Sequence, residues 1–271
     1  MVTLLAKAMP AWRRLADTLP GERLLREEGH LVAWGSDGSA QAGRIAWAAA
    51  DTGSARLHEA DAAEQAMPRR LSPTVAGAIR FETTGQIADL SQLASALEDE
   101  FQAAGWRLVR GRATLGRQKR RAAVTVDRGE PQSPAALLVT AGVHSGLLLA
   151  PFGHQAPLIA ERGYHIRTAD HDWPADLPPV VFEDRSMIAT RYRHCVQAAS
   201  FVELGHPHGP PDPQQVGAAG AAFRGTRPAH ALTFSTLDGR SPDLSPITCR
   251  QSAGAIAPTT SSTRSTTNIL G

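Results

Sequence analysis

The residues best suited to holding a ligand lie in the hexapeptide AGVHSG, residues 141–146. They end the apolar run AALLVTAG at 135–142, whose unbroken aliphatic character is typical of a strand buried on both faces. Gly142 lets the backbone approach a ligand closely, and the Ser145 hydroxyl is suited to capping a helix or donating to a phosphate or polyol oxygen. A second interpretation, in which Gly142 only turns the chain after a strand, stays open. A nucleophile elbow is excluded, because that motif needs serine at the centre of G-x-S-x-G.

A second group with possible chemistry is Arg162, Tyr164 and His165, in the segment ERGYHIR. The segment reads as a strand, and successive side chains on a strand point to opposite faces. At most one of Tyr164 and His165 therefore faces a substrate directly. The alternatives are that Tyr164 packs in a core, that His165 is an ordinary hydrogen-bonded polar residue, and that Arg162 is a surface charge.

The histidines and cysteines near residue 200 do not predict a metal site. The spacing of His194, Cys195, His206 and His208 matches no standard zinc pattern. The second cysteine, Cys249, is distant in sequence, and two cysteines cannot form a disulfide framework. We therefore expect no metal and a cytoplasmic location.

Composition excludes several partner classes. The 271 residues include 28 basic and 26 acidic side chains, so the near-zero balance predicts no nucleic-acid partner. No apolar run approaches the length of about 18 residues that a membrane helix needs. The first residues, MVTLLAKAMPAWRR, lack the features of a secretory signal and predict an amphipathic helix.

The order of predicted elements indicates a mixed α/β fold. We expect strands at 30–34, 78–81 and 106–111, and mostly helix over 42–71. A helix capped by Asp89 or Ser91 should end at Gly105, and a hairpin should span 113–128. A buried parallel strand at 135–142 then precedes strands within 157–167, 178–193 and 196–204, which suit an antiparallel sheet.

Together these segments resemble one known family. The stretch LLVTAGVHSGLLLAPFGHQAPLIAERGYHIR, followed by PPVVFEDRSMIATRY and AASFVELG, is similar to the FAD-dependent D-amino-acid dehydrogenase/oxidase family. The resemblance covers roughly residues 1–213. It implies that Ala141, Gly142 and Ser145 lie beside FAD, and that Arg162, Tyr164 and His165 face a small amine or amino-acid substrate.

The resemblance also implies a domain organisation. Residues 1–84 would be mostly substrate domain, 85–150 the remainder of the FAD-binding domain, and 151–213 the antiparallel sheet of the substrate domain. The fold would then be a partial FAD-binding layer interleaved with that sheet. Residues 214–271 read as low-complexity sequence, because positions 245–271 hold 11 serines and threonines and no acidic residue. Such a tail is expected to be disordered.

Two motifs that the family shares are missing. The sequence contains no G-x-G-x-x-G, the turn whose glycines hold the FAD pyrophosphate, so the chain reads as truncated at its N-terminal side. The segment resembling Trp-Gly-x-Arg-Pro, whose arginine pairs with the substrate carboxylate, is also absent after Pro213. Permitted codons read one or two bases later encode family-like, aromatic-containing segments there. The hypothesis is one frameshift near Pro213 and another near Leu244.

The expected function follows from the resemblance. The family oxidises D-amino acids or similar amines to imines, which hydrolyse to 2-oxo acids, and the flavin carries the chemistry. This chain is expected to be inactive or nearly so, because it lacks the pyrophosphate turn and the carboxylate-binding arginine. The alternatives are a non-catalytic remnant or interaction module without flavin and, last, a metal-binding protein.

Overall fold

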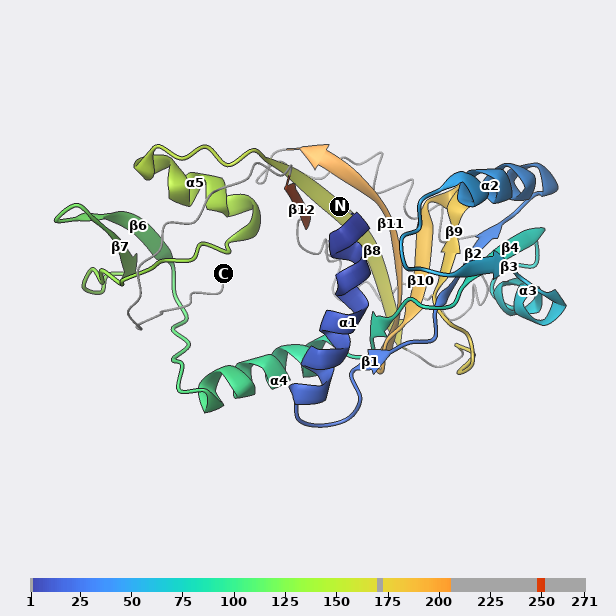
Figure 1. The fold of residues 1–271 in the computed structure, drawn as a ribbon, viewed down its shortest axis with the longest axis horizontal. Helices are drawn as coiled ribbons and strands as arrows, with labels where there is room; N and C mark the ends of the chain where they lie inside the picture. The colour runs from blue at the N-terminus through green and yellow to red at the C-terminus, as the bar shows by residue number, and fades with distance from the viewer. Residues whose placement is uncertain (1, 170–172, 206–247, 252–271) are drawn as a thin grey trace, which may run out of the picture. The chain divides into compact units, whose positions relative to one another are not determined.

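The computed structural model describes residues 2–169, 173–205 and 248–251. They fold as two compact units, whose elements are labelled in Figure 1. Unit 1 takes its described residues from 2–97 and 163–202, and unit 2 from 98–162, 203–205 and 248–251. The mixed α/β class expected from the sequence is confirmed. The predicted tail, 214–271, lies outside the described residues apart from 248–251.

Unit 1 is built on a mixed sheet whose strands pair in the order β8–β11–β10–β9–β2–β4–β3. Strands β9, β10 and β11 pair antiparallel, as expected, whereas β2 and β9 run parallel with Leu31 opposite Val180. This parallel pair joins parts of the chain that are far apart in sequence. The strands of this sheet are β2 (His30–Trp34), β3 (Leu57–Glu59), β4 (Gly77–Phe81), β8 (Leu158–Ala169), β9 (Val180–Phe182), β10 (Met187–Arg191) and β11 (Cys195–Gly205). A separate antiparallel pair is formed by β1 (Leu25–Arg26) and β5 (Gln86–Ile87).

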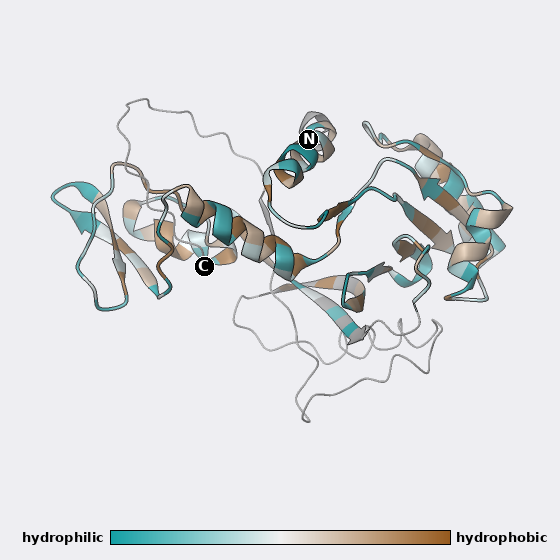
Figure 2. Ribbon diagram, turned by 90° about the horizontal axis from the view of Figure 1, so that it is seen from below, coloured by the Kyte–Doolittle hydropathy of each residue, from teal (hydrophilic) through white to brown (hydrophobic). Residues whose placement is uncertain are grey.

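Side-chain caps fix the N-terminal ends of three helices of unit 1. The predicted amphipathic N-terminal helix is confirmed as α1, and Figure 2 shows both hydrophilic and hydrophobic residues along it. Ser36 caps α2, and Asp61 and Glu64 form a capping box at α3. Asp89 accepts hydrogen bonds from two backbone amides at the start of α4, as expected. The helices are α1 (Val2–Thr18), α2 (Asp37–Ala49), α3 (Ala62–Arg69) and α4 (Leu90–Ala103), whose last residues belong to unit 2.

The segment 42–71, expected to be mostly helix, is helical at both ends but is interrupted between α2 and α3. Helix α2 ends at Ala49, and Gly53 adopts a positive φ of 61° while its amide bonds the Asp51 carboxylate. The chain then forms β3, which pairs with β4. The Asp–Gly turn and this pairing override the helical propensity of the alanines.

The two faces of β2 bury different hydrophobic clusters. Leu31 and Ala33 contribute to a cluster that also takes residues from β9 and β10. Val32 and Trp34 point the other way and pack with Ala40 of α2. This alternation is what a central strand covered on both faces requires.

The short helix η3 (Glu183–Arg185) fastens β9 to the start of α2. The indole nitrogens of Trp34 and Trp47 donate to the two carboxylate oxygens of Glu183, at 2.5 and 3.2 Å. The amide of Gly35 and the hydroxyl of Ser39 donate to one oxygen of Asp184. Adjacent carboxylates thus hold the parallel pair β2–β9 in register.

Unit 2 carries the predicted hairpin, formed by β6 (Ala113–Gln118) and β7 (Arg121–Val126). After it come η1 (Gly142–His144), α5 (Ser145–Leu149) and η2 (Ala150–Phe152). Strand β12 (Thr248–Gln251) pairs antiparallel with Leu158–Glu161, the first residues of β8.

Two strands predicted for unit 2 are not formed. Residues 106–111 and 137–141 belong to no strand, and Leu138 is 64% exposed where a buried strand was expected. A parallel strand needs hydrogen-bonded neighbours and cover on both faces. Among the described residues, no strand pairs with either segment.

The contact between α2 and Trp34 generates a stability prediction. A Cβ at Gly43 would overlap the buried indole ring of Trp34, whereas a Cβ at Gly38, in the same helix, would meet no atom within 4 Å. Gly43→Ala should lower the free energy of unfolding by about 1–3 kcal/mol through overpacking. Gly38→Ala, the matched control, should raise it by about 0.5–1 kcal/mol through backbone entropy. Urea unfolding followed by tryptophan fluorescence measures both. Equal effects at the two sites would contradict the assigned packing.

A second prediction concerns pH. His30 stacks on Phe81, its Nδ1 lies 2.7 Å from Thr84 Oγ1, and burial lowers its pKa from 6.5 to about 4. The unfolded chain therefore binds this proton more readily, so His30 should reduce stability as pH falls from 6.5 towards 4, by about 3 kcal/mol at most. The variant His30→Gln should lose that part of the acid dependence in urea unfolding at stepped pH.

The control for the pH prediction is His58, which has the opposite sign. Its hydrogen bonds to Glu64 and Glu82 raise its pKa above 6.5. Its stabilising contribution is complete below pH 6.5 and is lost as pH rises through the raised pKa. The advantage of the wild type over His58→Gln should therefore be largest in acid. A His30→Gln variant with an unchanged acid slope would show that His30 is not a neutral buried group.

Candidate functional site

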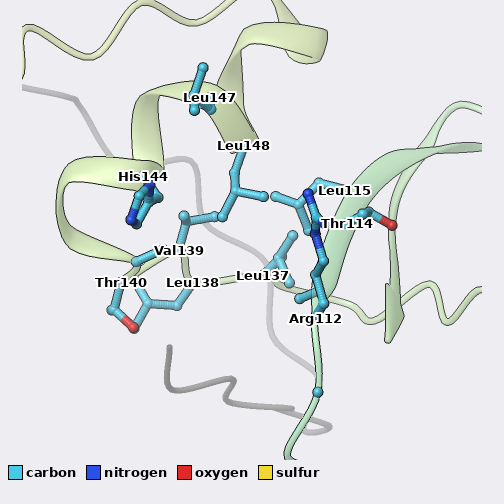
Figure 3. Close-up of a pocket in the computed structure, with 13 residues that line it drawn as sticks. Arg112, Thr114, Leu115, Leu137, Leu138, Val139, Thr140, His144, Leu147 and Leu148 are labelled. Carbon is cyan, nitrogen blue, oxygen red and sulfur yellow. The ribbon is translucent and has the colours of Figure 1, made fainter. Parts of the chain in front are cut away.

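The candidate site of unit 2 is a pocket of about 500 Å³ between the start of β6 and the segment 137–141. Figure 3 shows Leu115 of β6 and Leu148 of α5 approaching each other across it. Most of the wall is aliphatic, as in sites that hold the flat, apolar part of a ligand. It is lined by Gly111, Arg112, Ala113, Thr114, Leu115, Leu137, Leu138, Val139, Thr140, Ala141, His144, Leu147 and Leu148.

The hairpin fixes the position of the one arginine in this wall. The amide of Arg112 donates to the carboxylate of Asp127 at 2.9 Å, and the Asp127 amide donates back to the Arg112 carbonyl at 2.8 Å. A Cβ at Gly111 would collide with Asp127, so only glycine fits next to this closure. The guanidinium of Arg112, with Thr114, Thr140 and His144, gives the apolar pocket a polar rim.

Two of the three predicted cofactor residues, Ala141 and Gly142, lie at the end of the segment that lines the pocket. Ala141 lines the pocket, and Gly142 follows it with a positive φ of 53°. A Cβ at Gly142 would meet no atom within 4 Å, so the glycine is explained by its backbone conformation and leaves open space beside the pocket.

Ser145 does not cap a helix. It is the first residue of α5, its amide bonds the Gly142 carbonyl, and the capping position falls on His144, which makes no side-chain cap hydrogen bond. The Ser145 side chain is half-buried, one turn from Ala141.

The predicted substrate residues lie on β8 but divide between the units. Arg162 belongs to unit 2, whereas Tyr164 and His165 belong to unit 1. The side chain of Tyr164 lies outside the described residues. His165 is half-buried. Strand alternation places His165 on the same face as Arg167. The site roles of these residues stay predictions.

Arg167 was not among the residues predicted from the sequence. Its Nε donates to the side-chain oxygen of Gln197 on the neighbouring strand β11, at 2.8 Å, and its guanidinium is exposed. Burial raises the pKa of Tyr192, and the positive charge of Arg167 opposes that rise. In the sequence, Arg167 looks like any strand-end surface charge. Its distance of two residues from His165 was the available signal.

Within the described residues no group of three or more His, Cys, Asp or Glu side chains is arranged to hold a metal. The Nε2 of His194 lies 3.5 Å from the Oδ2 of Asp89. His206 and His208 fall outside the described residues. None of the helices in that part of the chain is long and apolar enough to span a bilayer.

Two oxidases of known structure share this fold. Iminodiacetate oxidase from Chelativorans superposes with a TM-score of 0.68, at 19% identity, over 93% of this chain and 69% of that enzyme. Glycine oxidase from Geobacillus kaustophilus gives a TM-score of 0.66, at 16% identity, over 83% of this chain and 61% of that enzyme. At these identities the likeness concerns the fold.

Two proteins with similar sequences are also amino-acid oxidoreductases. A D-amino acid dehydrogenase from Rhizorhabdus wittichii is 32% identical over 53% of this chain and 35% of that enzyme. A D-amino-acid oxidase from Bradyrhizobium diazoefficiens is 29% identical over 59% of this chain and 36% of its own length. The match thus spans about a third of each curated relative.

The family model "FAD dependent oxidoreductase" matches residues 1–258. The match extends beyond Pro213, whereas the resemblance seen in the sequence ends at about that residue. With the fold, the pocket beside Ala141 and these relatives, this match shows that the chain belongs to the family of FAD-dependent oxidoreductases.

Proposed function

We propose that this chain contributes to the oxidation of a D-amino acid or a similar small amine, giving an imine that water hydrolyses to a 2-oxo acid. The carrying observation is the pocket beside Ala141 and Gly142, in a chain of an FAD-dependent family. The relatives that support the substrate class are a D-amino acid dehydrogenase and a D-amino-acid oxidase.

The residues of unit 2 fit part of a dinucleotide cofactor. The aliphatic wall suits a flat ring system, and Arg112 supplies a positive charge suited to a phosphate. Gly142 leaves open space where a cofactor would pass close to the backbone. We assign Ala141, Gly142 and Ser145 to the cofactor side of the site and Arg162, Tyr164 and His165 to the substrate side.

When bound, FAD supplies a two-electron acceptor for the hydride that leaves the carbon bearing the amine. The protein's part is to bind and orient the substrate. His165 lies on β8 in unit 1, two residues before Arg167, and we assign it to contact with the substrate. No side chain of the chain is assigned as an acid–base catalyst.

We further propose that the chain by itself turns over slowly or not at all. The sequence holds no G-x-G-x-x-G, so the backbone amides that would bind the FAD pyrophosphate at a helix N-terminus are not provided by that motif. Loss of contacts that orient both reactants lowers rates by orders of magnitude.

The alternative function is a non-catalytic module without flavin. The observation in its favour is the exposure of Leu138 and Leu147 at the pocket, 64% and 70%. Large exposed aliphatic side chains gathered at one place mark a surface that another protein segment covers. This alternative requires that no flavin binds at stoichiometric ratio.

The two functions are separated by titrating the full chain with FAD and following flavin fluorescence polarisation. We expect saturable, weak binding, reduced several-fold in Gly142→Ala, because the new methyl group fills the space beside the pocket and strains a positive φ. Gly153→Ala is the matched control. Gly153 also has a positive φ, 79°, and open space. Gly142 directly follows the lining residue Ala141, whereas Gly153 lies five residues beyond Leu148, the last lining residue. Flavin that fails to bind supports the non-catalytic module.

Activity is tested on the FAD-loaded chain with a panel of D-amino acids under anaerobic conditions. The expected result is little or no bleaching of the flavin absorbance. Rapid bleaching with release of the 2-oxo acid would overturn the proposed inactivity and keep the proposed chemistry. Bleaching with L-amino acids only would overturn the substrate class.

A further inference from the structure

Three neighbouring strands of unit 1 present one polar face around Arg167. The register pairs Thr190 of β10 with Gln197 of β11, and Gln197 accepts the hydrogen bond from Arg167 of β8. Ile188, opposite Ala199 in the next row of the same face, is 39% exposed. We call this surface the Arg167 face; its residues are His165, Arg167, Ile188, Gln197 and Ala199, together with Thr190, which is buried.

The hydrogen bond at Arg167 orients the guanidinium without neutralising it. Gln197 is an uncharged partner, and it engages only Nε. The terminal nitrogens then point along a fixed direction, and arginine offers donors in a planar fork that matches a carboxylate. The field of this charge reaches the half-buried Tyr192 hydroxyl. A preorganised cation of this kind suits an acidic group better than a freely rotating surface arginine does.

The spacing along β8 sets the size of the ligand. Arg167 is two residues beyond His165 on the same face, which is about 7 Å along a strand. A substrate whose reacting end lies near His165 would therefore meet Arg167 with the far end of its side chain. A four- or five-carbon amino acid has that reach.

We propose that Arg167 binds a second acidic group on the substrate, so that the substrate class is amines or D-amino acids with an acidic side chain, of the size of D-glutamate. This inference rests on the proposed function, since it places the reacting end of the substrate at His165. It assigns specificity to Arg167. The group recognised is a carboxylate on the side chain, separate from the α-carboxylate that all amino acids share.

The test uses binding of unreactive probes to the full chain, without flavin, by isothermal titration calorimetry. Glutarate carries two carboxylates, and glutaramate has the same shape with one of them replaced by an amide. We expect glutarate to bind about fivefold more tightly, as one partly exposed charge-assisted contact allows. Arg167→Gln should abolish the preference, and Arg167→Lys should keep part of it.

A matched control and a spectroscopic signature separate recognition from general charge. Arg56, 75% exposed and paired with Glu82 in the same unit, is the control: Arg56→Gln should leave the preference unchanged. Glutarate, but not glutaramate, should also shift the nuclear magnetic resonance signals of the Gln197 side-chain amide, because Gln197 shares the guanidinium with the ligand. A merely structural role of Arg167 would not produce that selective shift.

The inference is overturned by equal binding of the two probes, by no saturable binding of glutarate, or by a preference that survives Arg167→Gln. Its failure is distinguishable from failure of the proposed function. If FAD-dependent oxidation is found with D-glutamine as fast as with D-glutamate, the function holds and the assigned specificity fails. If no flavin binds while Arg167-dependent glutarate binding persists, the proposed function fails and the acidic-ligand site stands.

Discussion

The parallel pairing of β2 with β9 is the constraint on which unit 1 depends. It joins Leu31–Ala33 to Val180–Phe182 across most of the chain, and loop closure over such a distance must be offset by strong local contacts. Those contacts are present. Glu183 accepts from two tryptophan indoles and Asp184 from the start of α2, so two carboxylates bind both sides of the junction. Hydrogen bonds to ionised groups are roughly twice as strong as neutral ones.

The same junction determines the candidate substrate face. Strand β9 pairs with β10, β10 with β11, and β11 lies beside β8. The inner faces of β9, β10 and β11 are occupied by Val180, Phe182, Met187, Ala189 and Ala198 of the main core. By alternation, the outer face carries the exposed Arg167, the half-buried Gln197, and Thr190, which is only 8% exposed. Packing on one face therefore defines which side chains remain available on the other.

Local patterns made parts of both units predictable. The strand HLVAW, the cap at Asp89 and the hairpin at 113–128 depend on neighbours within a few residues, and each formed as expected. The pairing of β2 with β9 was not predictable. The apolar pattern of Leu31–Trp34 indicates a strand buried on both faces, but it does not indicate which strand pairs with it. Arg167 was missed for a related reason. Its orientation comes from Gln197, thirty residues away, on a strand whose register only the fold reveals.

The strands predicted at 106–111 and 135–142 do not form, for a different reason. Both segments have strand composition, but composition expresses only a need for partners, and a strand exists only where backbone groups pair. The domain boundaries at 84, 150 and 213 stay predictions. The site residues proposed on β8 come from a resemblance and stay predictions. The pocket wall could not be predicted, because it combines β6 with a segment that forms no strand.

The exposed leucines of unit 2 link cofactor binding to stability. Leu138 lines the pocket beside Ala141, so a ring system seated there would cover aliphatic surface that now faces water. Each Å² of apolar surface removed from water contributes about 25 cal/mol. A ligand that binds only the folded state also stabilises it by mass action.

In a chain without the pyrophosphate motif, this burial is the main source of affinity that the described part of unit 2 supplies. Such affinity depends on shape and apolar area, and one phosphate contact at Arg112 would orient the ligand without dominating its binding. The pocket therefore favours a flat aromatic group first and its phosphates second.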